Sequence, residues 1–489
     1  MIVKSDKTEI QDFLVDAANY KGDCDKVYFP ESNEEIVEIL KEANSKRIKI
    51  TVSGNGTGLT GARVPEGGIV IATNRLNKII EINSEEKYAV LQTGVILSDF
   101  HEKLDELNLY YPPDPTEQNC FIGATVSTNA SGAKTFKYGP TRNFVLGMKI
   151  ILPEGETLYL ERGKFTAENR KLKIRTDSDK ELEIDLPKYR LPFTKNSAGY
   201  FIEDGMDALD LFIGQEGTLG IITEVKIKLL PKPESVFSSV VFFDDEIDAL
   251  KFIIEARENS RAAESRIDAL GLEFFDRNAL MFLRDDYMLI PENAFAAVWL
   301  EQETTPESEE SIFDAWVEVI NKNNGNEETA WFALNDKERR KFQDFRHAVS
   351  YKVNEYITRK NKKKVGTDVA VPDQNFNELY FYSKKIVEEK KLNYIAYGHF
   401  GDNHLHLNML PADEKEYSAA KKIYGSICSK AVELNGTISA EHGIGKLKKE
   451  YLKLMFSQQE IEQMANLKKT LDPNWILGAG NIFDSQKYN

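Results

Sequence analysis

The sequence predicts an α+β chain of two lobes, and three observations lead to that prediction. A strand–helix–strand unit lies at residues 27–53, and glycine-rich segments interrupt the strands around and after it. The run Pro231-Lys232-Pro233 then breaks the chain, because proline neither continues a helix nor donates a backbone hydrogen bond. Beyond the break, strand-like runs alternate with amphipathic helical patterns, which predicts an antiparallel sheet with helices on one face.

Composition excludes several classes of protein. The chain has 489 residues, of which 41% are apolar, so it can build about two or three packed cores and is not a disordered chain. Its net charge of −16 argues against nucleic-acid binding, since a protein that follows phosphates needs an electropositive face. Its cysteines (Cys24, Cys120 and Cys428) have the spacing of neither a disulfide framework nor an iron–sulfur cluster.

These features give expectations about location. Without a disulfide framework we expect a reduced, cytoplasmic setting. The first residues lack the apolar core of a signal peptide, and no apolar run has the length of a membrane span. Peripheral contact with the inner face of the membrane stays open.

The first lobe begins with patterns of ordinary helices and strands. Residues 6–20 have the apolar spacing of a helix. A second helix follows at residues 34–47, with Asn33 as its cap, between strands at residues 27–32 and 48–54. Residues 67–83 predict a strand, a turn and a strand.

The strand at residues 48–54 runs directly into a glycine-rich loop at residues 53–61. Its glycines free the backbone for positive φ and let N–H groups converge on an anion. The loop is neither a Walker loop nor a dinucleotide-binding fingerprint. From the residues alone, a nucleotide-diphosphate site and a plain turn are both open.

Two further glycine-rich segments lie at residues 112–147 and 211–231. Small and hydroxylated residues dominate the first, and such residues let a backbone approach a planar ring system and form hydrogen bonds to it. The second enters a strand at residues 220–222. Three such segments in one lobe predict a single extended cofactor.

The charged stretch at residues 154–190, which lies between the last two glycine-rich segments, predicts a surface β-ribbon.

The second lobe contains a cluster of histidines in residues 393–410, where two alternating strands flank a turn at residues 400–403. A four-residue loop pairs His399 with His404 and places both on one face with His406. Imidazoles on one face suit a divalent metal, while a polar, solvated face is the alternative.

A metal held by imidazoles usually needs a further donor. The best candidate is Glu441, which His442 follows directly.

Six motifs in combination resemble those of one enzyme family. They are SGNGTGLTGA, PPDPTEQNCFIGATVSTNASGAKTFKYG, LFIGQEGTLGIIT, GHFGDNHLHLN, AEHGIGK and LDPNWILGAGNIF. Over residues 25–485 the chain is similar to FAD-dependent D-2-hydroxyacid dehydrogenases of the vanillyl-alcohol-oxidase type. This family includes D-lactate dehydrogenases, the flavin subunit of glycolate oxidase and D-2-hydroxyglutarate dehydrogenases.

The resemblance implies a division into an FAD-binding domain of two α+β subdomains at residues 1–232, a substrate or cap domain at residues 233–430, and a segment at residues 431–489 that packs back on the FAD domain. We expect non-covalent FAD, because the loop at residues 53–61 has no histidine to attach it. The implied cofactor contacts are Ser53, Gly54, Asn55, Gly56, Thr57, Gly58, Leu59, Thr60, Pro113, Asp114, Gly123, Ala124, Ser127, Thr128, Asn129, Gly132 and Ile222.

The resemblance also implies a divalent metal, zinc first, with manganese or iron as alternatives. The implied ligands are His399, His406 and Glu441, and His442 matches the catalytic base. Two further positions match residues that contact the substrate, Asn408 and Arg346, with Arg346 as the partner of its carboxylate. The alternative for Arg346 is a surface ion pair, because its surroundings are dense in charge.

Two features depart from the family pattern. His404 stands where relatives often have asparagine, and we expect it to be a bystander, since a catalytic metal keeps a position open. Some relatives that act on dicarboxylates carry a lysine just before the aspartate that matches Asp368, whereas Gly366 and Thr367 precede it here. This difference favours a small acid, D-lactate first, with D-2-hydroxyglutarate or glycolate as alternatives.

The implied reaction oxidises a metal-chelated D-2-hydroxy acid to the 2-oxo acid, with His442 taking the hydroxyl proton and hydride passing to flavin N5. The alternative is a flavin-assisted, non-redox transfer like that of alkyl-dihydroxyacetone-phosphate synthase.

The chain has neither an NAD fingerprint nor iron–sulfur ligands, so we expect an external electron acceptor: a quinone, a cytochrome, an electron-transferring flavoprotein or a partner subunit. The basic run at residues 359–364 predicts a solvated loop, with docking to an acidic surface as the alternative. We expect no nucleic-acid partner, and a homodimer is a candidate assembly.

Overall fold

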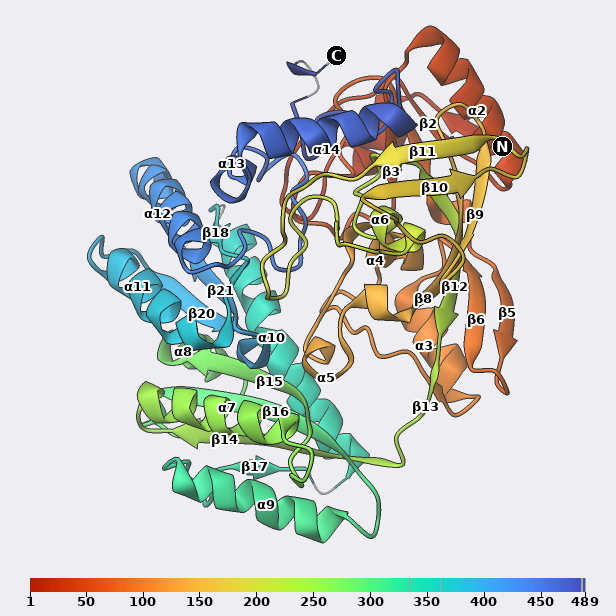
Figure 1. Ribbon diagram of the computed structural model, residues 1–489. Coiled ribbons are helices and arrows are strands. Elements are labelled where there is room, and N and C mark those ends of the chain that lie inside the picture. Colours follow the sequence, from red (N-terminus) through yellow and green to blue (C-terminus); the bar gives the residue numbers. More distant parts are fainter. Residues whose placement is uncertain (334, 361, 485–486, 489) are drawn as a thin grey trace.

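The structure is a computed structural model that describes residues 1–333, 335–360, 362–484 and 487–488. The N-terminal part, red to yellow in Figure 1, and a large sheet of green to blue strands lie beside each other. The chain crosses between them near β13 (Leu230–Pro231), at the predicted break. No helix among these described residues has the length and apolarity to cross a membrane.

The first helix is shorter than predicted. Helix α1 spans Lys7–Ile10 and continues as a 3₁₀ turn, Gln11–Phe13, so the prediction of a helix over residues 6–20 is wrong. Asp16 explains this result, because its side chain accepts the backbone N–H groups of Ala18 at 3.0 Å and Tyr20 at 3.1 Å. These bonds hold a loop where the helix would continue.

The predicted strand–helix–strand unit forms a small sheet in the order β1-β2-β4-β3, in which β2, β4 and β3 run parallel. Helix α2 (Asn33–Lys46) crosses between β2 and β3, as predicted. Its cap is Ser32 and not Asn33, because the Ser32 hydroxyl accepts the N–H of Glu35 at 3.3 Å. The strands are β1 (Ile2–Lys4), β2 (Lys26–Phe29), β3 (Ile50–Ser53) and β4 (Ile69–Ala72).

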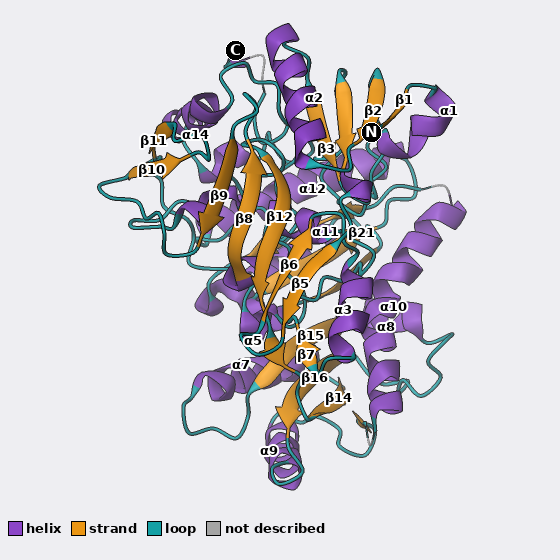
Figure 2. Ribbon diagram, turned by 90° about the vertical axis from the view of Figure 1, so that its right-hand side faces the viewer, coloured by secondary structure: helices purple, strands orange, loops and turns teal. Residues whose placement is uncertain are grey.

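A five-stranded antiparallel sheet follows in the order β5-β6-β12-β8-β9 (Figure 2). Its strands are β5 (Ile79–Asn83), β6 (Tyr88–Gln92), β8 (Val145–Ile151), β9 (Thr157–Glu161) and β12 (Ile221–Lys228). Short elements connect them: α3 (Leu97–Asp105), β7 (Leu109–Tyr110), α4 (Ile122–Thr128), α5 (Thr135–Tyr138) and α6 (Ala208–Phe212).

The charged stretch forms the predicted β-ribbon from β10 (Lys171–Arg175) and β11 (Glu181–Asp185). Its charged residues are exposed, but Leu172, Ile174 and Ile184 are buried in the core that also contains residues of α14 (Gln458–Leu471). The ribbon therefore packs against the end of the chain.

The large sheet has the order β17-β14-β16-β15-β20-β21-β18, with β19 also paired to β21, and all its pairings are antiparallel. The strands are β14 (Ser235–Phe243), β15 (Ala269–Asp276), β16 (Ala296–Thr304), β17 (Trp331–Phe332), β18 (Val365–Gly366), β19 (Val369–Ala370), β20 (Tyr394–Gly398) and β21 (His404–Met409). The helices are α7 (Glu246–Arg261), α8 (Arg277–Leu283), α9 (Glu309–Lys322), α10 (Asp336–Lys360), α11 (Phe376–Glu388), α12 (Glu414–Glu433) and α13 (Leu452–Met455).

Helices cover both faces of this sheet and not one face only. Along β14, Val241 and Phe243 pack in the core with α7 and α9, whereas Val240 and Phe242 pack in a second core with α8 and α10. Successive apolar residues along a strand are the pattern of a sheet buried on both sides. The antiparallel sheet is as predicted, and α8 and α10 on the second face correct the prediction.

The end of the chain returns to the N-terminal part. The backbone N–H of Ile50 in β3 donates to the carbonyl of Ile476 at 2.6 Å. The Asn481 amide donates to the carbonyls of Ala62 and Glu216, each at 2.9 Å. Residues 476–481 are therefore bonded to segments next to the glycine-rich loops.

The basic run at residues 359–364 lies near the start of α12, with residue 361 outside the described residues. The Lys363 ammonium pairs with Glu414 at 3.2 Å, and the Lys362 ammonium donates to the carbonyl of Ala412. Part of the run is thus neutralised within the chain.

Asp276 at the start of α8 predicts a pH-dependent stability. It is 2% exposed and caps the helix by accepting the N–H of Ala279 at 2.7 Å, and burial raises its pKa from 3.8 to about 7. Its stabilising contribution is therefore present below pH 3.8 and lost as pH rises through about 7. Because asparagine also caps helices, we expect Asp276→Asn to raise the unfolding temperature at pH 8 by roughly 2 °C and to raise it by a smaller amount at pH 5, where only part of the contribution is lost.

Thermal unfolding followed by circular dichroism measures both values. Asp413→Asn, at the exposed cap of α12, is the matched control substitution. An equal effect of Asp276→Asn at both pH values would contradict the prediction.

Candidate active site

The histidine hairpin has the predicted register. Tyr397 pairs with His406 across β20 and β21, and the same register places His399 opposite His404. Phe400–Asp402 forms a 3₁₀ turn, and Asn403 adopts φ of 54°. The ring centroids of His399 and His404 are 5.3 Å apart, so the histidines share one face as predicted.

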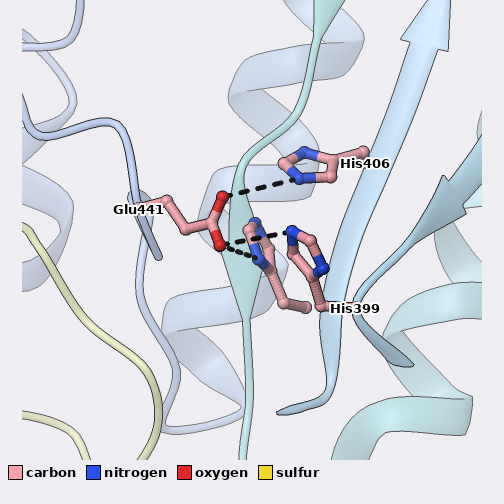
Figure 3. Close-up of side chains that lie close together, drawn as sticks. His399, His406 and Glu441 are labelled. Carbon is pink, nitrogen blue, oxygen red and sulfur yellow. Dashed lines mark ion pairs between the residues drawn. The ribbon is translucent and has the colours of Figure 1, made fainter. Parts of the chain in front are cut away.

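The Glu441 side chain comes from a separate segment and points toward the histidines on this face (Figure 3). Its Oε1 lies 3.2 Å from His399 Nε2 and 3.8 Å from His404 Nδ1, and its Oε2 lies 3.9 Å from His406 Nε2. These four residues each offer one ligand atom, and the atoms lie within 4.8 Å of one another. Two or more imidazoles with a carboxylate form a donor set that suits zinc, manganese or iron.

Lys195 is a buried cation in this cluster that the sequence did not single out. Its ammonium pairs with Glu441 Oε1 and lies 3.9 Å from Asp402 Oδ2. Burial alone would raise the pKa of Glu441, but Lys195 and the histidines hold it well below its usual range. The glutamate is therefore an anion at neutral pH, and a metal would have to share or replace its ammonium partner.

Asp368 fixes the turn that carries Glu441 and His442. This 1% exposed carboxylate accepts the backbone N–H of Glu441 at 3.2 Å and that of His442 at 3.0 Å. It also accepts the Ser439 hydroxyl at 2.8 Å and the Lys448 ammonium at 2.6 Å. The sequence identified Asp368 only as a neighbour of a substrate-binding position, because its partners lie about seventy residues away.

His442 lies between Asp368 and the histidine face. Its Nδ1 is 3.3 Å from Asp368 Oδ2, and its ring stacks on that of His406 at a centroid distance of 5.6 Å. Its side chain is 27% exposed, whereas that of Asp368 is 1% exposed. Burial lowers the pKa of His442 despite the nearby Asp368 carboxylate. A neutral imidazole with one nitrogen toward a carboxylate has the form of a general base.

Arg346 on α10 is 6% exposed, so the alternative of a surface ion pair is wrong. Its Nε lies 3.4 Å from Glu273 Oε2, and Glu273 Oε1 lies 2.6 Å from His399 Nδ1. Burial alone would raise the pKa of Glu273, but His399 and Arg346 lower it to about 2. Asn408 is 5% exposed and donates to the Tyr397 hydroxyl at 3.1 Å.

The glycine-rich loop at residues 53–61 lies against the segment that follows His442. The Thr60 carbonyl accepts the backbone N–H of Lys446 at 2.8 Å, and the Thr60 hydroxyl lies 3.4 Å from the His442 carbonyl. The Lys446 ammonium donates to the Gly61 carbonyl at 3.2 Å. The predicted diphosphate loop and the predicted base are therefore neighbours.

The segment around α4 also reaches the cluster, since the Ser131 hydroxyl lies 3.0 Å from Glu441 Oε1. A Cβ at Gly132 would lie 1.9 Å from the Asp114 carbonyl, and one at Gly123 would lie 2.3 Å from Thr93 Cβ. These close approaches explain why the loop needs glycine there.

Two buried threonines lie beside predicted cofactor residues. Thr223, next to Ile222 at the start of β12, and Thr93, at the end of β6, each have a buried hydroxyl with no hydrogen-bond partner among the described residues. Such buried hydroxyls fit a region that receives a polar ligand. Ser127, Thr128 and Ala124 lie along α4, Asn129 ends it, and Pro113 and Asp114 lie in the loop that contacts Gly132.

Gly58 gives a direct test of the cofactor loop. It is exposed, and a Cβ built on it meets no atom within 4 Å. We therefore expect Gly58→Val to fold normally and to lower the FAD content of the purified protein at least about tenfold, because the side chain occupies space next to backbone groups that would bind a diphosphate. The ratio of flavin absorbance to protein absorbance measures the content.

Gly425 on α12 provides a comparison, because a Cβ there also has an ordinary environment, with its nearest contact at 3.4 Å. Gly425→Val is expected to keep its flavin. Full flavin content in Gly58→Val would show that the loop does not hold the cofactor.

Two family models match the chain. One, described as FAD linked oxidases, C-terminal domain, covers residues 232–482, and the other, described as FAD binding domain, covers residues 24–161. The "Glycolate oxidase subunit GlcD" of Bacillus subtilis is 29% identical over 95% of this chain and 90% of its own. A "D-lactate dehydrogenase" of Anaerostipes hadrus is 30% identical over 92% of this chain and 88% of its own. A "D-2-hydroxyglutarate dehydrogenase" of Stutzerimonas stutzeri is 28% identical over 94% of this chain and 90% of its own.

Solved structures share the fold. An alkyldihydroxyacetonephosphate synthase superposes with a TM-score of 0.69 at 17% identity, over 97% of this chain and 81% of that chain. A 4-ethylphenol oxidase from Gulosibacter chungangensis superposes with a TM-score of 0.69 at 18% identity, over 98% of this chain and 94% of that chain. At this identity the similarity concerns the fold alone.

Proposed function

The chain belongs to the FAD-linked oxidases, and from that premise we propose that it oxidises a D-2-hydroxy acid to the 2-oxo acid. The observation that carries the proposal is the meeting of three segments. The histidine hairpin contacts Glu441, and the segment after His442 contacts the glycine-rich loop at residues 53–61. A candidate base, a candidate metal centre and a candidate flavin site are thereby adjacent. Relatives named as D-lactate and D-2-hydroxyglutarate dehydrogenases support the substrate class.

His399, His406 and Glu441 would hold the metal, with zinc first and manganese or iron as alternatives. Two observations support the presence of a cation: His404 Nδ1 is buried without a hydrogen-bond partner among the described residues, and Glu441 is an anion. A bound divalent metal would lower the pKa of a hydroxyl group that coordinates it. Glu273 orients His399 by accepting a hydrogen bond from the Nδ1–H group of His399. The Nε2 atom of His399 then faces the cluster.

His442 would take the hydroxyl proton at Nε2, while its Nδ1 stays toward Asp368. Non-covalent FAD would supply the hydride acceptor at its N5. Arg346 would bind the substrate carboxylate through its planar guanidinium, and Asn408 would add a hydrogen-bond donor from β21. These three residues come from different parts of the fold. Arg346 lies in α10, Asn408 lies in β21, and His442 lies in the segment after α12.

The substrate is proposed to be small. The residues before Asp368 are Gly366 and Thr367, and the Thr367 hydroxyl donates to the Leu405 carbonyl at 3.0 Å. This position therefore offers no cation for a second, distal carboxylate. D-lactate is the first candidate, and glycolate and D-2-hydroxyglutarate are the alternatives.

The electrons are proposed to leave to an acceptor outside the chain, such as a quinone, a cytochrome, an electron-transferring flavoprotein or a partner subunit. Turnover with an artificial acceptor, dichlorophenolindophenol, tests the function without knowledge of the natural one. We expect dye reduction with D-lactate, equimolar formation of pyruvate, and no reaction with L-lactate. Dye reduction without formation of pyruvate would contradict the proposal. Equal rates of dye reduction with D-lactate and L-lactate would contradict it too.

The alternative is a non-redox, flavin-assisted transfer, suggested by the shared fold of alkyldihydroxyacetonephosphate synthase. Such a transfer has no net change of oxidation state to pass to an acceptor, so it would leave the dye oxidised. The two functions therefore give opposite results in the same assay.

A further inference from the structure

We propose that His404 is a third imidazole ligand of the metal centre, held in its ligating orientation by Asp368. The inference rests on the proposed function for the centre of His399, His406 and Glu441. It adds a ligand where the sequence led us to expect a bystander, and it assigns Asp368 a role in positioning that ligand.

The outer ring nitrogen of each of the three imidazoles lies next to an oxygen atom. A histidine that binds a metal almost always donates its other ring N–H to a carboxylate or carbonyl. His399 Nδ1 lies 2.6 Å from Glu273 Oε1, His406 Nδ1 lies 3.2 Å from the Thr367 carbonyl, and His404 Nε2 lies 2.9 Å from Asp368 Oδ1. His404 therefore has the same outer partner arrangement as the two predicted ligands.

The direction of the bond at His404 follows from the other partners of Asp368. Its Oδ1 also accepts the backbone N–H of Glu441, and its Oδ2 accepts Ser439 and Lys448. Since Asp368 acts as an acceptor throughout, His404 Nε2 carries the proton and donates it. The Nδ1 atom of His404 is then an unprotonated lone-pair donor.

The inner nitrogen of His404, Nδ1, is buried near Glu441. The residue is 0% exposed, and its Nδ1 has no hydrogen-bond partner among the described residues. That atom lies 3.8 Å from Glu441 Oε1, and His399 Nε2 lies 3.2 Å from the same oxygen, while His406 Nε2 lies 3.9 Å from Glu441 Oε2. The ligand atoms of His399, His404, His406 and Glu441 all lie within 4.8 Å of one another, so the four side chains could hold one ion.

A purely structural role does not account for this histidine. Asp368 already has partners in Ser439, Lys448 and two backbone N–H groups, so it does not require His404 for neutralisation. Lys195 pairs with Glu441 but forms no hydrogen bond with His404 Nδ1. A buried lone pair without a donor destabilises the fold, and a cation among the four donors would satisfy it.

A catalytic metal usually keeps a position open, and for that reason we expected His404 to be a bystander. With four protein donors, a tetrahedral ion has no free position. A substrate that coordinates through two oxygens would then require an ion that accepts six ligands. Manganese and iron do so readily, so a third imidazole favours them over a zinc that remains four-coordinate.

Cobalt titration of the FAD-containing protein tests the inference after its native metal has been removed by a chelator. Co²⁺ absorbs in the visible region with bands that depend on its ligands, so affinity and spectrum come from one titration. We expect His404→Asn to weaken Co²⁺ binding at least about 100-fold and to change the spectrum, and Asp368→Asn to weaken binding about tenfold. His101→Asn is the matched control, because His101 on α3 lies outside the cluster, and its affinity and spectrum are expected to be unchanged.

X-ray absorption at the cobalt edge of the unsubstituted protein counts imidazoles without any substitution, so a variant that fails to fold leaves the inference testable. Three imidazoles support it, and two overturn it. Unchanged affinity and spectrum in a folded His404→Asn also overturn it, while the centre of His399, His406 and Glu441 would stand. Absence of Co²⁺ binding by the unsubstituted protein overturns the inference and the proposed metal centre, whereas the redox proposal is judged separately by dye reduction.

Discussion

Replacing His442 with alanine is expected to lower the rate of flavin reduction by D-lactate by roughly 10²–10⁴-fold, the usual contribution of a general base. The loss should fall on the chemical step, because the Asp368 carboxylate keeps its bonds to Ser439, Lys448 and His404 without this imidazole. Metal and FAD content should therefore stay unchanged. Anaerobic stopped-flow absorbance of the flavin measures the rate.

The control for His442→Ala is His101→Ala, the same substitution at a histidine outside the site. Added imidazole should restore part of the lost rate, because the 27% exposed side chain of His442 leaves a space open to solvent. A rate in His442→Ala within about threefold of the unsubstituted protein would remove His442 from the role of base.

Replacing Glu441 with glutamine is expected to remove the metal and to lower kcat/KM for D-lactate by roughly 10³-fold. Glutamine keeps the shape of the side chain but loses the charge that faces His399 and Lys195. It therefore removes the anionic ligand and leaves the Lys195 ammonium without its closest carboxylate. Metal analysis of the purified variant measures the first effect, and dye reduction measures the second.

Glu433, an exposed residue near the end of α12, gives the matched substitution Glu433→Gln, which should keep full metal content and activity. FAD should remain bound in both variants, because the hydrogen bonds between the loop at residues 53–61 and the end of the chain involve His442, Lys446 and Leu447 and not the side chain of Glu441. Full metal content in Glu441→Gln would contradict the role of Glu441 as a ligand.

The hairpin shows what the sequence could predict. Alternation and a four-residue loop were enough to place His399 opposite His404, and the structure has that register. The vanillyl-alcohol-oxidase-type fold and the membership of the FAD-linked oxidases, which the motifs implied, are also confirmed. These predictions depend on local periodicity and on motifs, both of which a single sequence contains.

The parts that the sequence missed depend on distant partners. Asp368, Glu273 and Lys195 reach the histidines from separate segments, and nothing in their local sequence indicates a shared site. The prediction of a helix over residues 6–20 was wrong for a local reason. The Asp16 side chain accepts backbone N–H groups that would otherwise form helical hydrogen bonds. The second helical layer on the large sheet did leave a signal, since apolar residues succeed one another along β14.

Anaerobic mixing of the FAD-containing protein with D-lactate tests the central claim most directly, because it observes hydride transfer to the flavin without any acceptor. We predict rapid bleaching of the flavin absorbance with D-lactate, no bleaching with L-lactate, and loss of the reaction after treatment with a chelator. Flavin that stays oxidised with D-lactate, glycolate and D-2-hydroxyglutarate alike would contradict the account.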